Sequence, residues 1–495
     1  MNTALPQALL RRNPLGWLGV FGPGAVIASL TIGAGELIFS SRGGALFGYH
    51  LLWYFACILF LKWILVYGVA RQMVLTGRHP FQRWMDIPGP RGWLTLVFLI
   101  LAAPAFPIWV AFHAGATGSL LAGLTGTARI FHGTGHYIWG MGLLGLVLVL
   151  ISQGGYARLE RLQLWIVLIM LATVVLSLVL LKPDWAAILE GILLPQRLAY
   201  PGWAQDLSEF QGRPVWVEVV TYVGIIGGSG YDYLAYGAYL RDKGWGGVDG
   251  IDTLESLSQK DPRRPLLRTW LRAPLVDCTL SFLAVLVFSG VFVACGALLL
   301  GPKHQIPAGS NLLALQADFV GDRFSWLKPL YFVGAFLTMF GTLYGTIEVA
   351  PAILREVALG FGWSTDRVRS TAVRWCGIGG FLVLVGSLWT TAQGQGGAAP
   401  GLVTILTPAN LFTGVLACGI VCASSLWIEL RLLPRDGRAH PVYLFLCAAA
   451  ALVFLFLGVK AYWDHSRWIA FGILAATGGA GFMGAKLMQR RSGGR

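Results

Sequence analysis

The chain has 495 residues, of which 56% are hydrophobic and only 12% are charged. The charged fraction is about half that of a typical soluble domain, so the composition excludes a soluble protein with a charged surface. The net charge of +14 would suit a nucleic-acid partner, but the chain has no basic stripe with interleaved aromatic residues. Most Lys and Arg residues instead fall on one side of the apolar runs, which is the positive-inside bias of membrane proteins.

Apolar runs of near twenty residues follow one another along the chain, and each is long enough to cross a hydrocarbon core of about 30 Å. We expect about twelve spans in a multi-pass protein of the plasma (inner) membrane, with both termini cytoplasmic. The expected spans are 17–43, 46–70, 93–124, 137–153, 160–181, 216–240, 270–300, 326–353, 372–392, 402–429, 441–461 and 467–488.

Span 1 is interrupted by a run of small residues, Thr31, Gly33, Ala34 and Gly35, that ends at Glu36. Each glycine in a helix interior costs about 1 kcal/mol relative to alanine, so this run predicts a break in the helix. Backbone N–H and C=O groups freed at such a depth are tolerated only where they are buried in protein or line a wet cavity.

Spans 2 and 3 each carry a basic side chain, Lys62 and His113. A charge in mid-span costs about 2.5–3.5 kcal/mol on insertion scales, so Lys62 should have a partner. One interpretation is functional: a salt bridge to Glu36 or Asp232, or an internal cation that replaces a coupling ion. The other is a structural pair with a buried acid. His113 would serve as a proton relay or, as we favour, as a packing histidine with satisfied hydrogen bonds.

Span 6 repeats the pattern of span 1, with Gly227, Gly228, Ser229 and Gly230 followed by Asp232. Glycines in membrane helices also serve close packing. Two glycine-rich runs that lie five spans apart, each followed by an acid, favour a site over packing. If five spans repeat in inverted order, span 1 corresponds to span 6, and interrupted helices at matching places indicate the binding site of a transporter.

Spans 7 and 8 contain further candidates for coupling or ion pairing. Asp277 lies close to Arg272 in the sequence, and we favour a structural ion pair between them. Thr342 and Thr346 share a helix face and would supply oxygens to a Na⁺ site, although such threonines more often bond back to their own helix. Glu348 follows two residues later.

The longest outer loop, 182–215, is expected to form short helices, and the longest inner loop, 242–268, is glycine-rich and then basic. The paired features fall in the first ten spans, so the last two are interpreted as accessory. The expected division is a cytoplasmic segment at 1–16, a core of two inverted repeats at 17–430, two accessory spans at 431–488 and a cytoplasmic tail at 489–495.

Several short stretches have the order and spacing of one known family. They are Gly22-Pro23-Gly24, Ala70-Arg71 with Thr76-Gly77, Pro183-Asp184-Trp185, Leu275-Val276-Asp277, and Gly341-Thr342 to Gly345-Thr346. In these stretches the chain resembles the Nramp family of metal-ion transporters. The resemblance implies an all-α integral membrane protein with a LeuT-type 5+5 inverted repeat plus two further helices. It also implies secondary active transport by alternating access, in which spans 1, 2, 6 and 7 rock against spans 3, 4, 8 and 9.

The chain departs from this family at the metal site. The family's Asp-Pro-Gly-Asn motif falls on residues 33–36, where its Asp becomes a glycine and its Asn becomes Glu36. Its Met-Pro-His motif falls on residues 228–230, where the Met becomes Gly228. The span 3 acids associated with proton movement are missing near Phe112 and Gly115. A manganese or iron site needs such ligands, so Glu36 is the only metal-ligand candidate.

Two kinds of substrate suit the rebuilt site. A hard divalent cation such as Mg²⁺ would bind Glu36 and backbone carbonyls while keeping part of its water shell. A small organic anion or zwitterion would bind free N–H groups at a half-helix N-terminus, and Glu36 would then bind an ammonium group or carry a coupling proton. The residues alone favour the organic solute slightly. A substrate sensor with the same fold is a further alternative.

Other classes find no support in the motifs. The chain lacks HExxH, GxSxG and phosphate-loop motifs, so we expect no enzyme activity and no cofactor. A channel filter repeat is also missing. The expected partners are the lipid bilayer, a small-molecule or ion substrate and a coupling ion, H⁺ or Na⁺. We expect a monomer and no nucleic acid.

Overall fold

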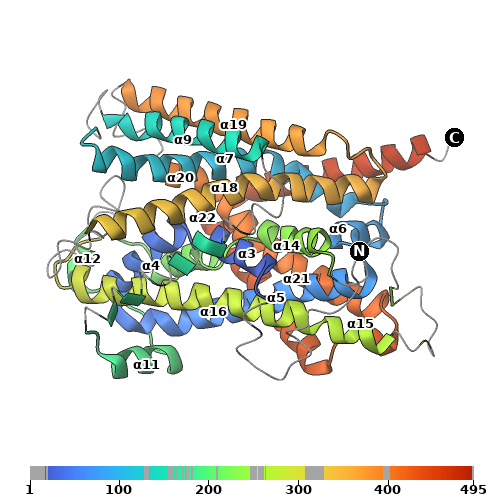
Figure 1. Cartoon of the computed structure of the whole chain (residues 1–495), viewed down its shortest axis with the longest axis horizontal. Coiled ribbons are helices and arrows are strands. Elements are labelled where there is room, and N and C mark those ends of the chain that lie inside the picture. The colour runs from blue at the N-terminus through green and yellow to red at the C-terminus, as the bar shows by residue number, and fades with distance from the viewer. Residues whose placement is uncertain are drawn as a thin grey trace.

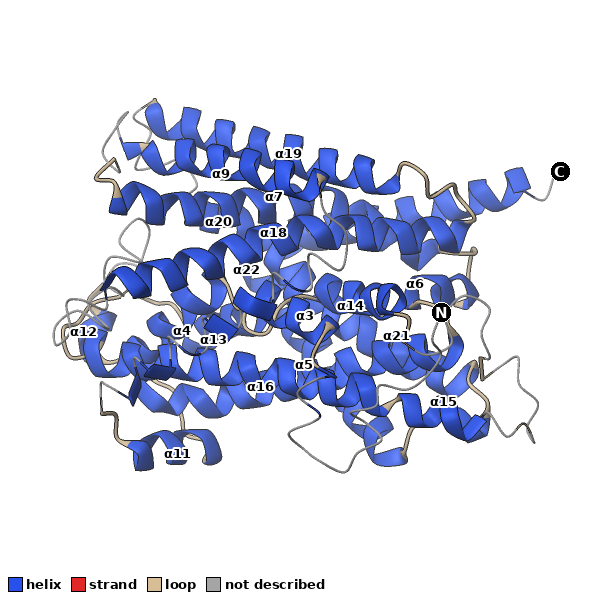
Figure 2. Cartoon of the chain, viewed as in Figure 1, coloured by secondary structure: helices blue, strands red, loops and turns tan. Residues whose placement is uncertain are grey.

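The fold consists of helices, which are packed in layers along the long axis of the molecule (Figures 1 and 2). The computed structural model describes residues 20–127, 133–153, 182–207, 210–245, 264–306, 328–393 and 402–492, together with a few isolated residues between these ranges. Within these ranges there is no β-strand, which agrees with the all-α membrane fold expected from composition.

The first half of the described chain contains ten α-helices, and two of the predicted spans in it are each interrupted and divided into two short helices. Its helices are α3 (Pro23–Thr31), α4 (Ala34–Phe47), α5 (Leu51–Thr76), α6 (Pro80–Arg83), α7 (Trp93–Leu124), α9 (Gly135–Ser152), α11 (Trp185–Leu193), α12 (Gly202–Gln205), α13 (Val215–Ile225) and α14 (Gly230–Lys243). Helices α11 and α12 are the short helices predicted within the loop 182–215.

The second half contains several longer helices and two π-helical segments, η4 and η7, that are continuous with α-helices. They are α15 (Arg264–Trp270), α16 (Arg272–Cys295) with η4 (Gly296–Leu300), α18 (Lys328–Phe361), α19 (Val368–Ala392), α20 (Leu402–Asn410) with η7 (Leu411–Leu416), α21 (Ala417–Arg431) and α22 (Pro441–Ser492). Most of the loop 242–268 lies outside the described residues.

Eight described helical stretches are long and apolar enough to cross a membrane. Predicted spans 1 and 6 are not among them as whole spans, because each is divided into two short helices, α3 with α4 and α13 with α14. Predicted span 5 lies largely outside the described residues. The last two predicted spans lie within α22, which has a kink at Arg467, where φ is 45°.

The broken helices lie between two groups of continuous helices. Helix α7 packs against α9, α18 and α19, whereas α16 packs against α3, α4 and α5. Figure 1 shows α9 and α19 along the upper edge, α16 and α11 along the lower edge, and α3 and α14 between them. This grouping matches the division into a moving bundle and a scaffold that the family resemblance implies, and it places both breaks at the junction of the two groups.

Candidate functional site

Both predicted breaks are present and lie side by side. Helix α3 ends at Thr31 and α4 begins at Ala34, while α13 ends at Ile225 and α14 begins at Gly230. Gly227 and Gly228 have φ values of 83° and 91°, a conformation that L side chains rarely adopt. The interruption of span 6 therefore depends directly on its two glycines.

The glycines also allow the two breaks to approach each other and α18. A Cβ added to Gly228 would lie 2.3 Å from Thr31 Cγ2, and one added to Gly33 would lie 2.1 Å from Thr342 Oγ1. Real Cβ atoms do not approach other atoms this closely. Small residues at these positions are thus required by packing between the breaks as well as by the backbone.

A cavity of about 600 Å³, part of it open to solvent, lies between the breaks, α7, α18 and η7. Its polar lining consists of hydroxyl, carboxyl and imidazole groups from Thr31, Glu36, His113, Ser229, Asp232, Thr342, Thr346 and Thr413. The remaining wall is small or apolar and includes Gly35, Gly228, Phe106, Trp109 and Tyr231. Hard oxygen groups therefore face the cavity, and no methionine or cysteine of the described part of the chain does.

The sequence predicted about half of this lining. Six predicted substrate-binding residues line the cavity, Thr31, Gly35, Glu36, Gly228, Ser229 and Asp232, and so do Thr342 and Thr346, which were predicted as candidates for ion coupling. Four other predicted substrate-binding residues, Gly33, Ala34, Gly227 and Gly230, contribute to the breaks without lining it. Phe106, Trp109 and Thr413 were missed, because α7 and η7 carry no glycine-rich break, and Tyr231 was missed although it directly follows the predicted break of span 6.

Glu36 joins the two breaks instead of pointing a free carboxylate into the cavity. Its Oε2 accepts a hydrogen bond from Gly33 N at 3.2 Å, and its Oε1 accepts one from Gly227 N at 3.0 Å. The side chain is only 1% exposed. As the third residue of α4 it caps the helix start by accepting from the N–H of the N-cap residue Gly33. Both oxygens of the only metal-ligand candidate are thus already bonded to backbone.

Asp232 is the accessible acid of the site. Its Oδ2 accepts a hydrogen bond from Ser229 N at 2.7 Å, which caps α14. Unlike Glu36, Asp232 is partly exposed, as are Ser229 and Gly228. A carboxylate has about four lone-pair positions, so this cap leaves acceptor capacity on the cavity side.

Lys62 binds backbone carbonyls of the span 6 break. Its Nζ donates to Ile226 O and to Gly228 O, both at 2.7 Å, and the side chain is fully buried. It forms no ion pair within the described part of the chain, so the predicted salt bridge to Glu36 or Asp232 is wrong, as is the alternative pairing with another buried acid. The ammonium lies among carbonyl dipoles because the break turns these oxygens toward α5.

Thr342 lies against the span 1 break. Its Oγ1 is 3.2 Å from both Ser29 O and Ile32 O and 3.1 Å from Thr338 O. The bond to Thr338 O is the back-bond to its own helix that threonines commonly form. One hydroxyl proton is shared among three acceptors here, so oxygen atoms of α3 and α18 converge at this point.

Asp277 and Glu348 lie outside the cavity. Asp277 accepts hydrogen bonds from Gly22 N at 2.9 Å, Gly24 N at 2.6 Å and Tyr236 Oη at 2.8 Å, and so ties the start of α3 to α16 and α14. Its predicted ion pair with Arg272 stays a prediction. Glu348 accepts two hydrogen bonds from Arg369 at 2.7 and 2.5 Å, which joins α18 to α19.

His113 lines the cavity from α7, where its ring stacks on Trp109 with centroids 5.4 Å apart. The residue is only 6% exposed, and its Nδ1 has no hydrogen-bond partner among the described residues. The expectation of a packing histidine with satisfied hydrogen bonds is therefore wrong for this nitrogen.

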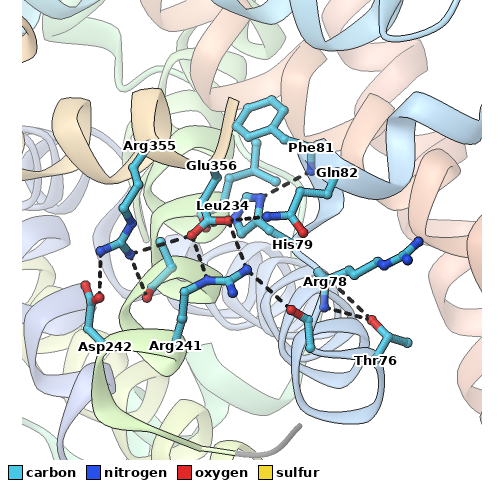
Figure 3. A network of polar contacts seen from close by, with 12 residues as sticks. Thr76, Arg78, His79, Phe81, Gln82, Leu234, Arg241, Asp242, Arg355 and Glu356 are labelled. Atoms are coloured by element: carbon cyan, nitrogen blue, oxygen red, sulfur yellow. Dashed lines mark hydrogen bonds and ion pairs between the residues drawn. The ribbon is translucent and has the colours of Figure 1, made fainter. Parts of the chain in front are cut away.

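A second polar network lies at the C-terminal end of α14 and was not predicted (Figure 3). Arg241 donates two hydrogen bonds to Glu356 at 3.0 and 3.2 Å, and Arg355 donates to Asp242 at 2.7 Å. Gln82 also donates to Glu356, at 3.1 Å. Because Glu356 is fully buried on α18, these contacts fix the end of the span 6 half-helix to the scaffold.

His79 contacts α14 nearer its start, at Leu234, from the segment between α5 and α7. Phe81 N donates to its Nδ1 at 3.2 Å, which places the ring proton on Nε2, and Nε2 lies 2.7 Å from Leu234 O. Burial lowers the pKa of His79 to about 4, because the charged form would lose its hydration. Both ring nitrogens are satisfied only in the neutral form.

The comparisons with known proteins agree with this architecture. The family described as natural resistance-associated macrophage protein-like, Nramp, matches residues 24–312, more than half of the chain. One mutant of the Eremococcus coleocola manganese transporter is similar in structure with a TM-score of 0.69 at 14% identity, over 99% of this chain and 98% of its own. A second mutant gives 0.68 at 14% identity, over 96% of each chain.

The same manganese transporter in complex with an aromatic bis-isothiourea substituted compound gives a TM-score of 0.65 at 14% identity, over 96% of each chain. No curated protein matches the sequence. At such identities the structural likeness establishes the fold alone. The LeuT-type fold expected from the sequence is confirmed.

Proposed function

The chain belongs to the natural resistance-associated macrophage protein-like (Nramp) family, and from that membership we propose that it carries a hard, partly hydrated divalent cation such as Mg²⁺ by alternating access. It is a multi-pass membrane transporter and not an enzyme. The observation that carries the proposal is the oxygen-lined cavity between the two breaks, where Asp232 keeps an accessible carboxylate.

The chemistry of the lining supports a hard ion. Mg²⁺ is usually held by one or two carboxylates and keeps several waters, which suits Asp232 with the hydroxyls of Thr31, Ser229 and Thr342. Imidazole suits iron, zinc and copper, and sulfur suits softer metals, whereas carboxylate, carbonyl and water oxygens suit Mg²⁺, Ca²⁺ and Mn²⁺. Among the residues that the structure describes, no sulfur faces this cavity and His113 is the only imidazole in its lining.

The same geometry argues against the organic anion that the sequence alone slightly favours. An anion would bind free N–H groups at the start of α4 or α14. Glu36 already accepts from Gly33 N and Gly227 N, and Asp232 accepts from Ser229 N. A substrate carboxylate would have to compete with these internal carboxylates at both helix starts, so the organic solute becomes the second candidate.

A saturable Mg²⁺ flux into proteoliposomes tests the proposal. We expect Asp232→Asn to raise the KM for Mg²⁺ by roughly tenfold or more, because a charged hydrogen-bonding or coordinating group is worth about 1.5–3 kcal/mol. Asp366→Asn is the matched control, since Asp366 is exposed and bonded only to nearby Ser364. An unchanged KM in Asp232→Asn, or saturable counterflow of an organic acid without Mg²⁺ flux, would overturn it. Binding without any exchange would favour a sensor.

The coupling ion is proposed to be H⁺, as is typical of this family, with Na⁺ as the second candidate. Na⁺ is favoured by the group of oxygens around Thr342 Oγ1. Those of Ser29 and Ile32 belong to span 1, in the moving bundle, and that of Thr338 belongs to α18, in the scaffold. Uptake that persists when Na⁺ is replaced by choline and collapses with a protonophore supports H⁺. The opposite result supports Na⁺.

A further inference from the structure

The span 6 break presents three consecutive carbonyl oxygens outside any helix, those of Ile226, Gly227 and Gly228. They lie between the end of α13 at Ile225 and the start of α14 at Gly230. In a continuous helix each would accept a bond from the N–H four residues later. An unsatisfied carbonyl at this depth would cost several kcal/mol, so side chains must replace those N–H groups.

Two side chains from different helices satisfy all three oxygens. Lys62 Nζ donates to Ile226 O and Gly228 O at 2.7 Å each. Tyr233 Oη donates to Gly227 O from within α14. The lysine stem lies directly on the break, because a Cβ added to Gly227 would be 3.4 Å from Lys62 Cδ. The ammonium thus sits where two carbonyl dipoles converge.

We propose that Lys62 is a positioning residue whose ammonium acts as a built-in monovalent cation, holding the span 6 break in its unwound shape. Converging backbone carbonyls are the groups with which proteins bind small monovalent cations. A tethered ammonium fills such a place permanently, without uptake of an ion from solution. This role is independent of which substrate the cavity carries, and it assigns a function to a residue that does not line that cavity.

The proposal predicts that truncation of Lys62 creates a binding site for a free cation. Lys62→Ala removes the lysine side chain beyond Cβ, which leaves a void beside the carbonyl oxygens of Ile226 and Gly228. A short alkylammonium ion should bind in this void. Lys62→Met fills the same space with an uncharged chain and should bind none. Lys460→Met is the matched control, since Lys460 lies over the Trp216 ring at 3.9 Å, away from both breaks.

The test measures thermal unfolding of the purified proteins in detergent at constant ionic strength, with choline replaced by propylammonium, ethylammonium or K⁺. We expect Lys62→Ala to unfold roughly 5 °C or more below the wild type and to regain most of that difference in propylammonium, with ethylammonium less effective. The wild type, Lys62→Met and Lys460→Met should show no difference between choline and propylammonium. Mg²⁺ transport by Lys62→Ala in proteoliposomes should be lost in choline and restored in propylammonium.

Two results would overturn the proposal. One is a folded Lys62→Ala protein that propylammonium neither stabilises nor reactivates. The other is Lys62→Met with wild-type stability and transport, because the lysine would then be a spacer whose charge is irrelevant. The second result decides the matter even if Lys62→Ala does not fold. Since stability is read without Mg²⁺, failure here leaves the substrate proposal untouched.

Discussion

The two broken helices are similar in sequence, but their backbone oxygens are satisfied in different ways. In span 6 a lysine from another helix and a tyrosine from the following half-helix bind all three carbonyls of the interruption. In span 1 the oxygens of Ser29 and Ile32 converge with that of Thr338 on a single hydroxyl, Thr342 Oγ1. The span 6 break thus contains a built-in cation, whereas these oxygens of the span 1 break contact a neutral hydroxyl.

This difference suggests a division of labour within one site. A break held by a buried ammonium has a fixed shape, and it presents Asp232 at the start of α14 in a fixed place. The span 1 break stays joined to span 6 through Glu36, but its contact with the opposite helix group through the Thr342 hydroxyl can be released when the groups move. We therefore expect span 6 to hold the substrate ligand and span 1 to respond to ions and to conformational change.

The largest effect should follow from Gly228→Ala. The new Cβ would collide with Thr31 Cγ2, and φ is 91° at this residue, so both strain and overlap disturb the span 6 break. We expect transport to fall by more than roughly tenfold.

Gly145→Ala is the control, because a Cβ at Gly145 meets no atom within 4 Å. The double variant Gly228→Ala with Thr31→Ser removes the overlap but not the backbone strain, so it should recover part of the loss. Full activity of Gly228→Ala alone would show that the span 6 break is not fixed in shape.

The next largest effect should follow from Glu36→Gln, which breaks the link between the two breaks. Glutamine keeps one carboxyl-like acceptor but turns an NH₂ group toward Gly33 N or Gly227 N, so one buried N–H loses its acceptor. We expect a loss of about 2–3 kcal/mol of unfolding free energy, measured by thermal or denaturant unfolding. Glu190→Gln, on the exposed helix α11, should change little. Equal stability of the two variants would contradict this role of Glu36.

Low pH should weaken the anchor of the span 6 half-helix through His79. The folded protein keeps this residue neutral down to a pKa of about 4, whereas the unfolded chain takes up a proton near its ordinary pKa of about 6.5. The unfolded state thus binds more protons between these values, and stability should fall as the pH drops from about 6.5 to about 4. The loss should reach about 3 kcal/mol.

His79→Asn should flatten this part of the pH profile of the unfolding midpoint. His440→Asn is the matched control, since His440 Nδ1 also accepts a backbone N–H at a helix start, from Val442, but its side chain is exposed. Parallel profiles for the wild type and His79→Asn would show that another group causes the pH dependence.

The smallest effect should come from Thr342, and it should act on span 1 alone. Thr342→Val removes the hydroxyl at nearly constant volume and should cost about 1 kcal/mol, while Thr342→Ser should be close to wild type. If Na⁺ uses the converging oxygens, only Thr342→Val should lose the dependence of uptake on Na⁺ concentration. A Na⁺ dependence that is identical in both variants would place the ion elsewhere.

The sequence by itself determined the class of the protein and the location of its two helix breaks. Long apolar runs, few charges and the positive-inside bias are local properties that define membrane helices without knowledge of their packing. Glycines in the interior of spans 1 and 6 predict breaks for the same reason, because the cost of glycine in a helix does not depend on distant residues. Thr31, Glu36 and Asp232 were therefore found before their contacts were visible.

Only the tertiary structure decided what those residues bind. The bonds of Glu36 to Gly227 and of Lys62 to Ile226 and Gly228 join residues more than 160 positions apart, and no local pattern specifies such a pairing. A lysine in mid-span predicts a hydrogen-bond partner, but the sequence does not distinguish a carboxylate partner from a backbone carbonyl partner. Whether the lysine binds a carboxylate or a carbonyl depends on the direction in which the carbonyl groups of the broken backbone point. The packing of α5 against α14 fixes that direction.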